Sequence, residues 1–535
     1  MAAMVESPTT PSVFIISERC AGCTECIKEC PRGCLTMDYR NWVVQVDSEA
    51  CSGCRQCQRA CPYQNITVSG PFLGLNSRIP ARELGVAQRL GNFDEVALSF
   101  TVDEAVKEAA RCLHCLRPQC RDIGCPAHND IPAMNAAIRN RDFAGAMRAF
   151  APTTNLPTIC SRVCDQAKQC EGACVYRREG GQAVAIGKLE RFMSEWAMAN
   201  DFQPNAVQPA SGYRVAVVGA GPAGLAAAED LAKAGHAVTV FDPLPVAGGI
   251  LAWGIPEFIL PAAVVAAKVA QVQALGVQFR LGTRVGTGNS VDKLLQDGFS
   301  AVFLAAGAGK DNTLSLPGSD LKGVITATSY LSAAKLAKGA PDQYKVPATG
   351  DNMLVIGAGN TAMDVARTAR RLGVKNVTAI DILSEELAPV RRDELETARA
   401  EGVNVRFAVS TKSFSGRGKV ETVELVRMDA RRDHTNKIST TPIPGSEFTL
   451  PVDTVVFAMG YRVTQEAIAD TKGISTEPRG TVTIVGENGQ TSREGVWAAG
   501  DIATGPSTVV RSMAAAKRAA AAIDQALRLK SKKAG

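Results

Sequence analysis

The residues with the clearest potential for chemistry in this chain are its cysteines. All 17 lie between Cys20 and Cys174, and the rest of the 535 residues contain none. Within each group, neighbouring cysteines are separated by only two to five other residues. The start of the chain has neither the basic nor the apolar region of an export signal. We therefore expect reduced thiols that bind metal rather than disulfide bonds.

One cysteine pattern occurs twice near the beginning of the chain. Each copy has three cysteines at steps of three residues and a fourth before a proline, as in Cys30-Pro31 and Cys61-Pro62. In two-cluster ferredoxins, three such cysteines hold one [4Fe–4S] cluster and the fourth ligates the neighbouring cluster. We therefore predict two clusters. Their ligand sets are Cys20, Cys23, Cys26 and Cys61, and Cys51, Cys54, Cys57 and Cys30.

Residues 13–70 resemble the bacterial two-cluster ferredoxins, and the resemblance implies a small α+β domain. A pair of zinc sites is the alternative interpretation. Zinc would not need three ligands at strict three-residue steps together with a Cys-Pro pair, so the spacing favours the clusters. Cys34 lies outside the pattern, and we expect it to be a packing cysteine.

Eight further cysteines form two more groups. They are Cys112, Cys115, Cys120 and Cys125, and then Cys160, Cys164, Cys170 and Cys174. Between the two groups, residues 131–150 have apolar side chains at helical steps. We therefore predict a helical domain over residues 71–205, whose helices frame the cysteine loops.

A dinucleotide-binding pattern occupies residues 213–242. Gly219, Gly221 and Gly224 follow a predicted buried strand and open an alanine-rich helix. The next predicted strand ends at Asp242. Such glycines allow the backbone to approach a pyrophosphate, and the aspartate can accept hydrogen bonds from the adenosine ribose. The pattern predicts a Rossmann-like fold.

A second copy of this pattern occupies residues 351–381. It has Gly357 and Gly359, with Ala362 where a third glycine could stand, and it again runs from strand to turn to helix to strand. We predict a second dinucleotide site, with contacts from Gly357, Gly359, Asn360 and Thr361.

From about Thr101 to its end, the chain resembles three related proteins. These are the small subunit of NADPH-dependent glutamate synthase, the N-terminal half of dihydropyrimidine dehydrogenase and the large subunit of ferredoxin–NADP transhydrogenases. The resemblance implies two more [4Fe–4S] clusters, each with ligands from both cysteine groups. The implied ligand sets are Cys112, Cys115, Cys120 and Cys174, and Cys125, Cys164, Cys170 and Glu190.

Glu190 enters this set only through its position in the family, 16 residues after Cys174. By itself, a glutamate on a helix is expected to lie in solvent. With Glu190 included, fifteen cysteines and one carboxylate supply the sixteen ligands of four cubanes. Cys34 and Cys160 are then left over.

The resemblance also implies an FAD-binding fold in two segments, residues 213–310 and 450–535. A fold for NAD(P), residues 311–449, is inserted between them. This is the architecture of the disulfide reductases without their redox disulfide, since no cysteine follows Cys174. The expected FAD contacts are Gly219, Gly221, Gly224, Asp242, Gly248, Gly249, Gly500 and Asp501.

The second dinucleotide site departs from its relatives at Asp381. NADPH-using members commonly have a Tyr-Arg-Arg turn there, whereas this chain has Asp381-Ile382-Leu383. An aspartate accepts hydrogen bonds from the two ribose hydroxyls of NAD and repels a 2′-phosphate. We therefore expect a preference for NAD(H). The alternative is that Arg391 and Arg392 fold back to bind the phosphate of NADP(H).

Composition narrows the possible partners. A net charge of +6 gives little support for nucleic-acid binding. No run reaches the ~18 apolar residues of a membrane span, so we expect a cytoplasmic protein. No Ser/His/Asp group or paired-carboxylate site is evident, and no catalytic side chain is predicted because the cofactors carry the redox chemistry.

The leading hypothesis is an electron-transfer subunit that connects NAD(H), FAD and four [4Fe–4S] clusters to a low-potential catalytic subunit. A two-cluster ferredoxin module favours a thiamine-diphosphate 2-oxoacid oxidoreductase as that partner. The alternatives are a glutamate synthase small subunit and an NAD(P)H:ferredoxin oxidoreductase that uses soluble ferredoxin. A redox sensor or scaffold is the alternative without enzymatic activity.

Overall fold

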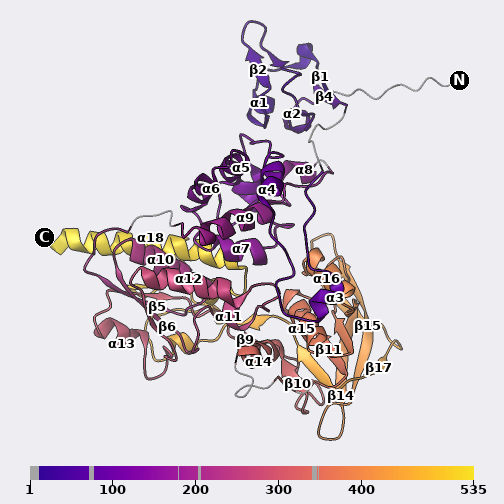
Figure 1. Ribbon diagram of the computed structural model, residues 1–535, viewed down its shortest axis with the longest axis vertical. Coiled ribbons are helices and arrows are strands. Elements are labelled where there is room, and N and C mark those ends of the chain that lie inside the picture. The colour runs from indigo at the N-terminus through magenta and orange to yellow at the C-terminus, as the bar shows by residue number, and fades with distance from the viewer. Residues whose placement is uncertain are drawn as a thin grey trace. The chain divides into compact units, whose positions relative to one another are not determined.

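The computed structural model describes residues 11–70, 77–178, 180–202, 207–339, 346–347 and 349–534 (Figure 1). The chain forms two compact units. The first contains residues 1–82 and 99–205, and the second contains residues 83–98 and 206–535. Residues 83–98 therefore belong to the second unit, although they lie within the range expected for the helical domain.

The ferredoxin-like part of the first unit is built from two similar halves. Its two antiparallel pairs are β1 (Ser12–Ile15) with β4 (Ile66–Ser69), and β2 (Leu35–Asp38) with β3 (Val43–Val46). Its helices are η1 (Ser17–Arg19), α1 (Glu25–Lys28) and α2 (Gln56–Ala60). Thr24 and Arg55, which precede α1 and α2, both have left-handed backbones. The duplication in sequence is thus also a duplication in local geometry.

The rest of the first unit is helical. Its elements are α4 (Val102–Ala109), η2 (Cys120–Gly124), α5 (Ile131–Arg139), α6 (Phe143–Phe150), α7 (Pro157–Val163), α8 (Val175–Arg178) and α9 (Ile186–Ala199). Thr101 and Glu104 form a reciprocal capping box at the start of α4. Asp130 and Asp142 accept hydrogen bonds from backbone amides at the starts of α5 and α6.

The second unit contains a seven-stranded sheet in the order β20-β21-β22-β8-β5-β6-β7. Its strands are β5 (Arg214–Val218), β6 (Ala237–Phe241), β7 (Gln278–Arg280), β8 (Ala301–Leu304), β20 (Ile484–Val485), β21 (Gln490–Thr491) and β22 (Val496–Ala498). Its helices are α10 (Pro222–Lys233), α11 (Ile250–Trp253), α12 (Ala262–Ala274), α13 (Val291–Gln296), η3 (Glu466–Ile468), α17 (Asp501–Thr504) and α18 (Val509–Ala534). The long α18, yellow in Figure 1, runs beside α10. We call this sheet and its helices the first fold.

A five-stranded parallel sheet forms the second fold, in the order β10-β18-β11-β12-β13. Its strands are β10 (Val324–Thr326), β11 (Asn352–Ile356), β12 (Asn376–Ile380), β13 (Asn404–Arg406) and β18 (Thr454–Phe457). Its helices are α14 (Ala327–Gly339), α15 (Asn360–Arg371) and α16 (Arg392–Ala400). Because β18 pairs with β10 and β11, this fold extends beyond residue 449, where the expected domain ended.

Three further features of the second unit have no counterpart in the sequence predictions. An antiparallel sheet covers the second fold, with strands β14 (Val409–Ser415), β15 (Thr422–Arg432), β16 (Ile438–Pro442) and β17 (Phe448–Pro451). The two connections between the folds pair with each other as β9 (Lys310–Asp311) and β19 (Tyr461–Arg462). Residues 83–98 contribute one short helix, α3 (Val86–Leu90).

A buried charge cluster holds α15 in the second fold. Arg371 donates hydrogen bonds to both carboxylate oxygens of Glu401, at 2.6 and 3.0 Å, and Arg367 donates to the same oxygens and to Glu394. Removing one partner of such a buried pair costs about 3–5 kcal/mol. The cluster therefore fixes α15 firmly. Among the described helices, none combines the length and apolar character needed to cross a membrane.

Candidate functional site

The structure brings together the first predicted ligand set in the ferredoxin-like part. Burial raises the pKa of Cys26 to about 11, and the nearby thiols of Cys23, Cys61 and Cys20 act in the same direction. Cys61 thus lies beside the three cysteines of the other half of the module. Cys23 is the exposed member of this set.

The second predicted set is more deeply buried. Burial raises the pKa of Cys57 to about 12, with further contributions from Cys54, Cys30 and Cys51. Cys34 lies beside this set, with its Sγ 3.3 Å from that of Cys30. A hydrogen bond from the Cys34 thiol lowers the pKa of Cys30 to about 6. The spare cysteine therefore contacts a predicted ligand.

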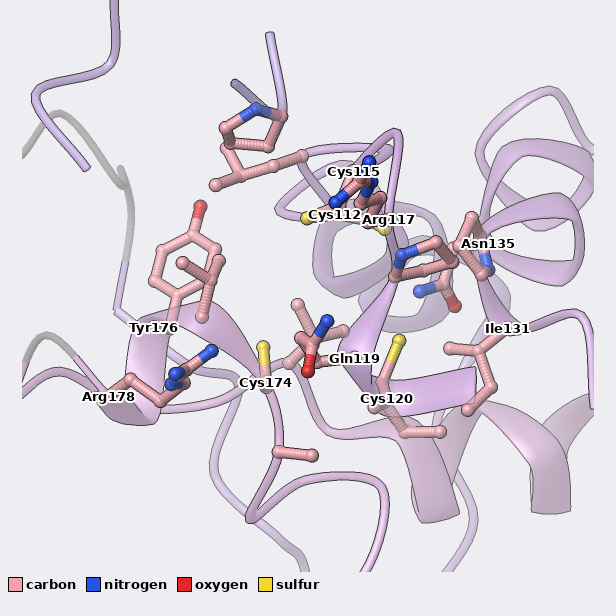
Figure 2. Close-up of a pocket in the computed structure, with 18 of the residues that line it drawn as sticks. Cys112, Cys115, Arg117, Gln119, Cys120, Ile131, Asn135, Cys174, Tyr176 and Arg178 are labelled. Atoms are coloured by element: carbon pink, nitrogen blue, oxygen red, sulfur yellow. The ribbon is translucent and has the colours of Figure 1, made fainter. Parts of the chain in front are cut away.

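In the helical part, the set implied by the family also comes together. Figure 2 shows Cys112, Cys115, Cys120 and Cys174 around one cavity. Burial raises the pKa of Cys115 to about 12, and nearby Cys112, Cys174 and Cys54 raise it further. Glu29, Pro31 and Gln56 of the ferredoxin-like part line the same cavity. Since Glu29 and Pro31 flank Cys30 and Gln56 precedes Cys57, the cavity lies next to the predicted set of Cys51, Cys54, Cys57 and Cys30.

The fourth set surrounds Glu190. Burial raises the pKa of Cys125 to about 11, and nearby Glu190 and Cys164 add to this shift. Cys170 likewise lies near the carboxylate of Glu190. Cys160, the second spare cysteine, is buried and hydrogen-bonds with Cys164.

Glu190 has the environment of a ligand rather than that of a surface glutamate. Only 6% of the residue is exposed, and its Oε1 has no hydrogen-bond partner among the described residues. Burial raises its pKa to about 8. A buried carboxylate without a partner is costly unless it is neutralised. An iron atom among Cys125, Cys164 and Cys170 would neutralise it, so the donor set fits a cluster.

Two buried glutamates set the position of α9, which carries Glu190. Glu108, on α4, accepts a hydrogen bond from the backbone amide of Ala185 at 2.8 Å. It also accepts one from Arg111, one residue before Cys112. Glu171 accepts from the amide of Gly187 at 3.1 Å. The start of α9 is therefore tied to both cysteine groups.

No group of three or more His, Cys, Asp or Glu side chains in the described ranges is arranged to hold a single metal ion. In a cubane each ligand binds a different iron atom, so its ligands need not converge on one point.

The first glycine loop leaves no room for larger side chains. A Cβ atom on Gly219 would lie 2.4 Å from the carbonyl oxygen of Ala305, and one on Gly224 would lie 1.8 Å from that of Gly219. Asp242 Oδ2 accepts a hydrogen bond from the amide of Ala220 at 2.7 Å. The loop, the start of α10 and the aspartate thus form the expected dinucleotide cradle.

The other expected FAD contacts lie against this cradle. A Cβ atom on Gly249 would lie 2.8 Å from Cα of Gly221, and the amide of Gly248 donates to Ala220. A Cβ atom on Gly500 would lie 3.0 Å from that of Ala223 on α10. Asp501 follows directly, and burial raises its pKa. Backbone approaches this close fit a bound diphosphate.

The second cradle repeats the first. A Cβ atom on Gly357 would lie 2.3 Å from the carbonyl oxygen of Ala458, and Gly359 caps α15. Asp381 accepts hydrogen bonds from the amides of Ala358 and Leu383, both at 2.9 Å. Asp242 makes the corresponding bonds to Ala220 and Leu244 in the first fold. The two aspartates therefore hold equivalent positions.

The residues around the second cradle include both predicted arginines. Asn360 accepts a hydrogen bond from the backbone amide of Arg391 at 3.0 Å. The Arg391 side chain pairs with Asp393, and Arg392 pairs with Glu385 at 3.0 Å. Thr361 hydrogen-bonds with Tyr461, a residue that the sequence patterns did not point to.

Three family models match the chain. Residues 213–521 match pyridine nucleotide-disulphide oxidoreductases, and this range is more than half of the chain. The chain belongs to this family. Residues 89–202 match the model described as dihydropyrimidine dehydrogenase domain II, 4Fe-4S cluster, and residues 19–65 match a 4Fe-4S dicluster domain.

Curated relatives match most of this chain. The putative oxidoreductase AegA of Escherichia coli is 35% identical over 469 residues, covering 85% of this chain and 71% of AegA. The glutamate synthase [NADPH] small chain of the same organism is 36% identical over 444 residues, covering 80% and 92%. The predicted resemblance to glutamate synthase small subunits and dihydropyrimidine dehydrogenase, with an added ferredoxin-like module, is confirmed.

A solved structure confirms the fold of the second unit. FprA of Mycobacterium tuberculosis in complex with NADPH is 21% identical, with a TM-score of 0.50, and the match covers 61% of this chain and 86% of FprA. The predicted multidomain α/β fold class is correct. This oxidoreductase is an NAD(P)H-dependent iron–sulfur flavoprotein with [4Fe–4S] clusters and FAD.

We predict that Glu190→Ala removes the cluster held by Cys125, Cys164 and Cys170, because three thiolates leave one iron without a protein ligand. Iron and acid-labile sulfide per FAD should fall by about one quarter, one cluster of the four predicted. Glu190→Cys should retain the iron and change the electron paramagnetic resonance (EPR) spectrum, since the type of ligand sets the electronic state of a cluster.

Glu195→Ala is the matched control for this prediction. Glu195 lies on the same helix and accepts a hydrogen bond from Arg191 at 2.8 Å. This variant should keep both the iron content and the EPR spectrum of the wild type. A Glu190→Ala protein with full iron content and an unchanged spectrum would show that Glu190 is not a ligand.

Proposed function

We propose that this protein is the electron-transfer subunit of a larger complex, and that it exchanges electrons between NAD(H) and a low-potential catalytic partner. The observation that carries the proposal is the proximity of Cys54 to Cys115. Cys54 adds to the raised pKa of Cys115, and Gln56, two residues after Cys54, lines the same cavity as Cys115. Cys54 belongs to a predicted ferredoxin-like set and Cys115 to a helical one. The two sets are thus neighbours within one unit.

The grouping of the predicted ligands supports a proposal of four clusters. Four sets of four side chains, fifteen cysteines and Glu190, account for four [4Fe–4S] clusters. When bound, FAD exchanges a hydride with the nicotinamide and single electrons with the clusters. The protein binds these groups and orients them.

The surface of the ferredoxin-like part supports electron transfer from this part to a partner protein. Cys23 is exposed, whereas Cys51, Cys54 and Cys57 of the other predicted set are buried. Trp42 is 61% exposed and covers the loop at Gly22, where an added Cβ would lie 3.1 Å from its ring. Exposed aromatic side chains are enriched at protein interfaces. The predicted set that contains Cys23 is therefore the more accessible of the two.

A 2-oxoacid oxidoreductase that uses thiamine diphosphate is the partner we favour, because such enzymes commonly use a two-cluster ferredoxin as their exit module. Relatives with subunit names support membership in a complex. One is the NADP(+)-dependent formate dehydrogenase subunit beta of Moorella thermoacetica, 36% identical over 430 residues, covering 76% of this chain and 59% of that protein. Glutamate synthase, whose small chains match over most of their length, is the second candidate.

Co-purification from the native host tests the choice of partner. We expect a tagged full-length chain, isolated without oxygen, to retain a thiamine-diphosphate subunit at a fixed ratio. The isolated complex should then reduce NAD⁺ with a 2-oxoacid. A glutamine amidotransferase subunit in its place would overturn this choice in favour of glutamate synthase. A chain that reduces soluble ferredoxin and carries no second subunit would favour the ferredoxin oxidoreductase.

The preference for NAD(H) rests on Asp381. Its carboxylate lies at the end of β12, in the position that Asp242 holds in the first fold, where we expect the ribose hydroxyls of FAD to bind. Arg391 and Arg392 already pair with acidic side chains, which weakens their attraction for a 2′-phosphate. The glutamate synthase relatives are named for NADPH, so the proposed preference would distinguish this chain from them.

We predict that kcat/KM for NADH exceeds that for NADPH, because the carboxylate of Asp381 repels the 2′-phosphate. Asp381→Ala should reduce this ratio by about tenfold to a hundredfold, since one charge-assisted contact is worth about 1.5–3 kcal/mol. Steady-state reduction of ferricyanide with each nucleotide measures the ratio. Arg392→Ala is the control and should leave it unchanged. A wild-type preference for NADPH that disappears in Arg392→Ala would assign nucleotide recognition to the arginines.

A further inference from the structure

Phe258 joins the two dinucleotide folds. It belongs to the first fold, between α11 and α12, and only 1% of it is exposed. Its ring centroid lies 3.9 Å from the guanidinium carbon of Arg371 and 4.7 Å from that of Arg367. Both arginines belong to α15 of the second fold. A side chain of the FAD fold therefore contacts the helix that begins at the nicotinamide cradle.

The two arginines present a rigid surface to this ring. Glu401 accepts hydrogen bonds from both of them and is itself 1% exposed. Cation–π contacts are stronger when they are buried, because water no longer competes for the cation. Because the arginines are held by Glu401, displacing Phe258 would require α15 to move with it or lose these contacts.

Residues 83–98, which we call the strap, reach both folds at the same place. The amide of Val96 donates a hydrogen bond to the carbonyl of Phe258 at 3.0 Å, and the ring of Phe93 lies 6.3 Å from that of Phe258. Arg89 lies 4.0 Å from Glu401. The strap thus contacts Phe258, which belongs to the first fold, and Glu401, which belongs to the buried charge cluster of the second fold.

A second set of contacts reaches the FAD cradle itself. Lys335, on α14 of the second fold, donates hydrogen bonds to the carbonyls of Leu251 and Ile255 at 3.1 and 2.6 Å. Ser332 donates to the carbonyl of Trp253 at 3.2 Å. These carbonyls lie in and just after α11, the helix that begins immediately after Gly249. The FAD cradle and the second fold are therefore connected at two places.

We propose that Phe258 is a positioning residue for hydride transfer. It fixes the tilt of α15, and so the place of the nicotinamide cradle relative to the FAD cradle. With 12 residues, α15 is about 18 Å long, so a tilt of about 3° moves its far end by about 1 Å. A displacement of that size can slow a reaction about a hundredfold. This inference rests on one part of the proposed function, the transfer of a hydride from the nicotinamide to FAD.

The test compares Phe258→Leu with the wild type in anaerobic stopped-flow reduction of the bound flavin by saturating nicotinamide. Leucine keeps the site apolar but removes the ring that the arginines contact. We expect the rate of flavin reduction to fall about tenfold to a hundredfold. The nucleotide concentration at half saturation should change by less than about threefold, because the residues around the cradle are intact. Phe258→Tyr, which keeps the ring, should restore the rate.

Phe299→Leu is the matched control. Phe299 is also buried and also contacts an arginine, with the guanidinium carbon of Arg214 at 4.4 Å from its ring centroid. Its aromatic neighbour is Phe241, 5.8 Å away between centroids, and all three residues belong to the first fold. A general loss of core packing would slow both leucine variants, whereas the proposed role slows only Phe258→Leu.

Amide hydrogen exchange gives a readout that needs no turnover. Phe258→Leu should increase exchange in the strap and in α15, and Phe299→Leu should not. Phe93→Leu alters a half-buried residue of the strap and should cause a smaller increase in exchange in the strap and in α15. This variant serves as the test if Phe258→Leu does not fold. Wild-type flavin reduction in Phe258→Leu, with unchanged exchange in the strap, would overturn the inference. A wild type whose flavin neither nicotinamide reduces would instead contradict the proposed function.

Discussion

Thiol groups that are buried side by side cannot all ionise, and this repulsion constrains the whole first unit. Burial and neighbouring sulfurs raise the pKa of Cys26, Cys57 and Cys115 to about 11–12. Such a group is stable only if its thiols stay protonated or if their thiolates bind iron, whose positive charge offsets theirs. Binding of the clusters is therefore coupled to folding. Because Cys61 joins Cys26 and Cys174 joins Cys115, each cluster would also cross-link distant segments of the chain.

The second unit contains two dinucleotide cradles with the same hydrogen bonds at their aspartates. Asp242 and Asp381 each accept hydrogen bonds from an amide of their glycine loop and from an amide two residues further along the chain. Two equivalent cradles are not sufficient for hydride transfer, since the nicotinamide must also lie against the flavin. The contacts of Phe258 with α15, and of Lys335 with α11, set that relation through side chains outside both cradles.

The sequence predicted the features that depend on local spacing. Cysteine steps and glycine loops act over a few residues, so the predicted ligands and cradle residues came together in the structure. Glu190 and the sharing of ligands between the two later cysteine groups are different, because only the resemblance to the family pointed to them. The burial of Glu190 became visible in the structure. The strap and the β14–β17 sheet were not predicted, since they depend on contacts such as Val96 with Phe258 between distant residues. For the same reason the boundary near residue 450 was placed before β18, which pairs inside the second fold.

The central claim is that one chain connects the nicotinamide site to all of its clusters. In the most direct measurement, the protein is fully reduced with dithionite and the excess reductant is removed. The reduced protein is then mixed with oxidised nicotinamide in the absence of oxygen, and the reduced nicotinamide formed per FAD is measured. FAD alone can return one hydride. The account predicts more than one reduced nicotinamide per FAD, together with recovery of the iron–sulfur absorbance. One reduced nicotinamide or less per FAD, with the clusters still reduced, would contradict it.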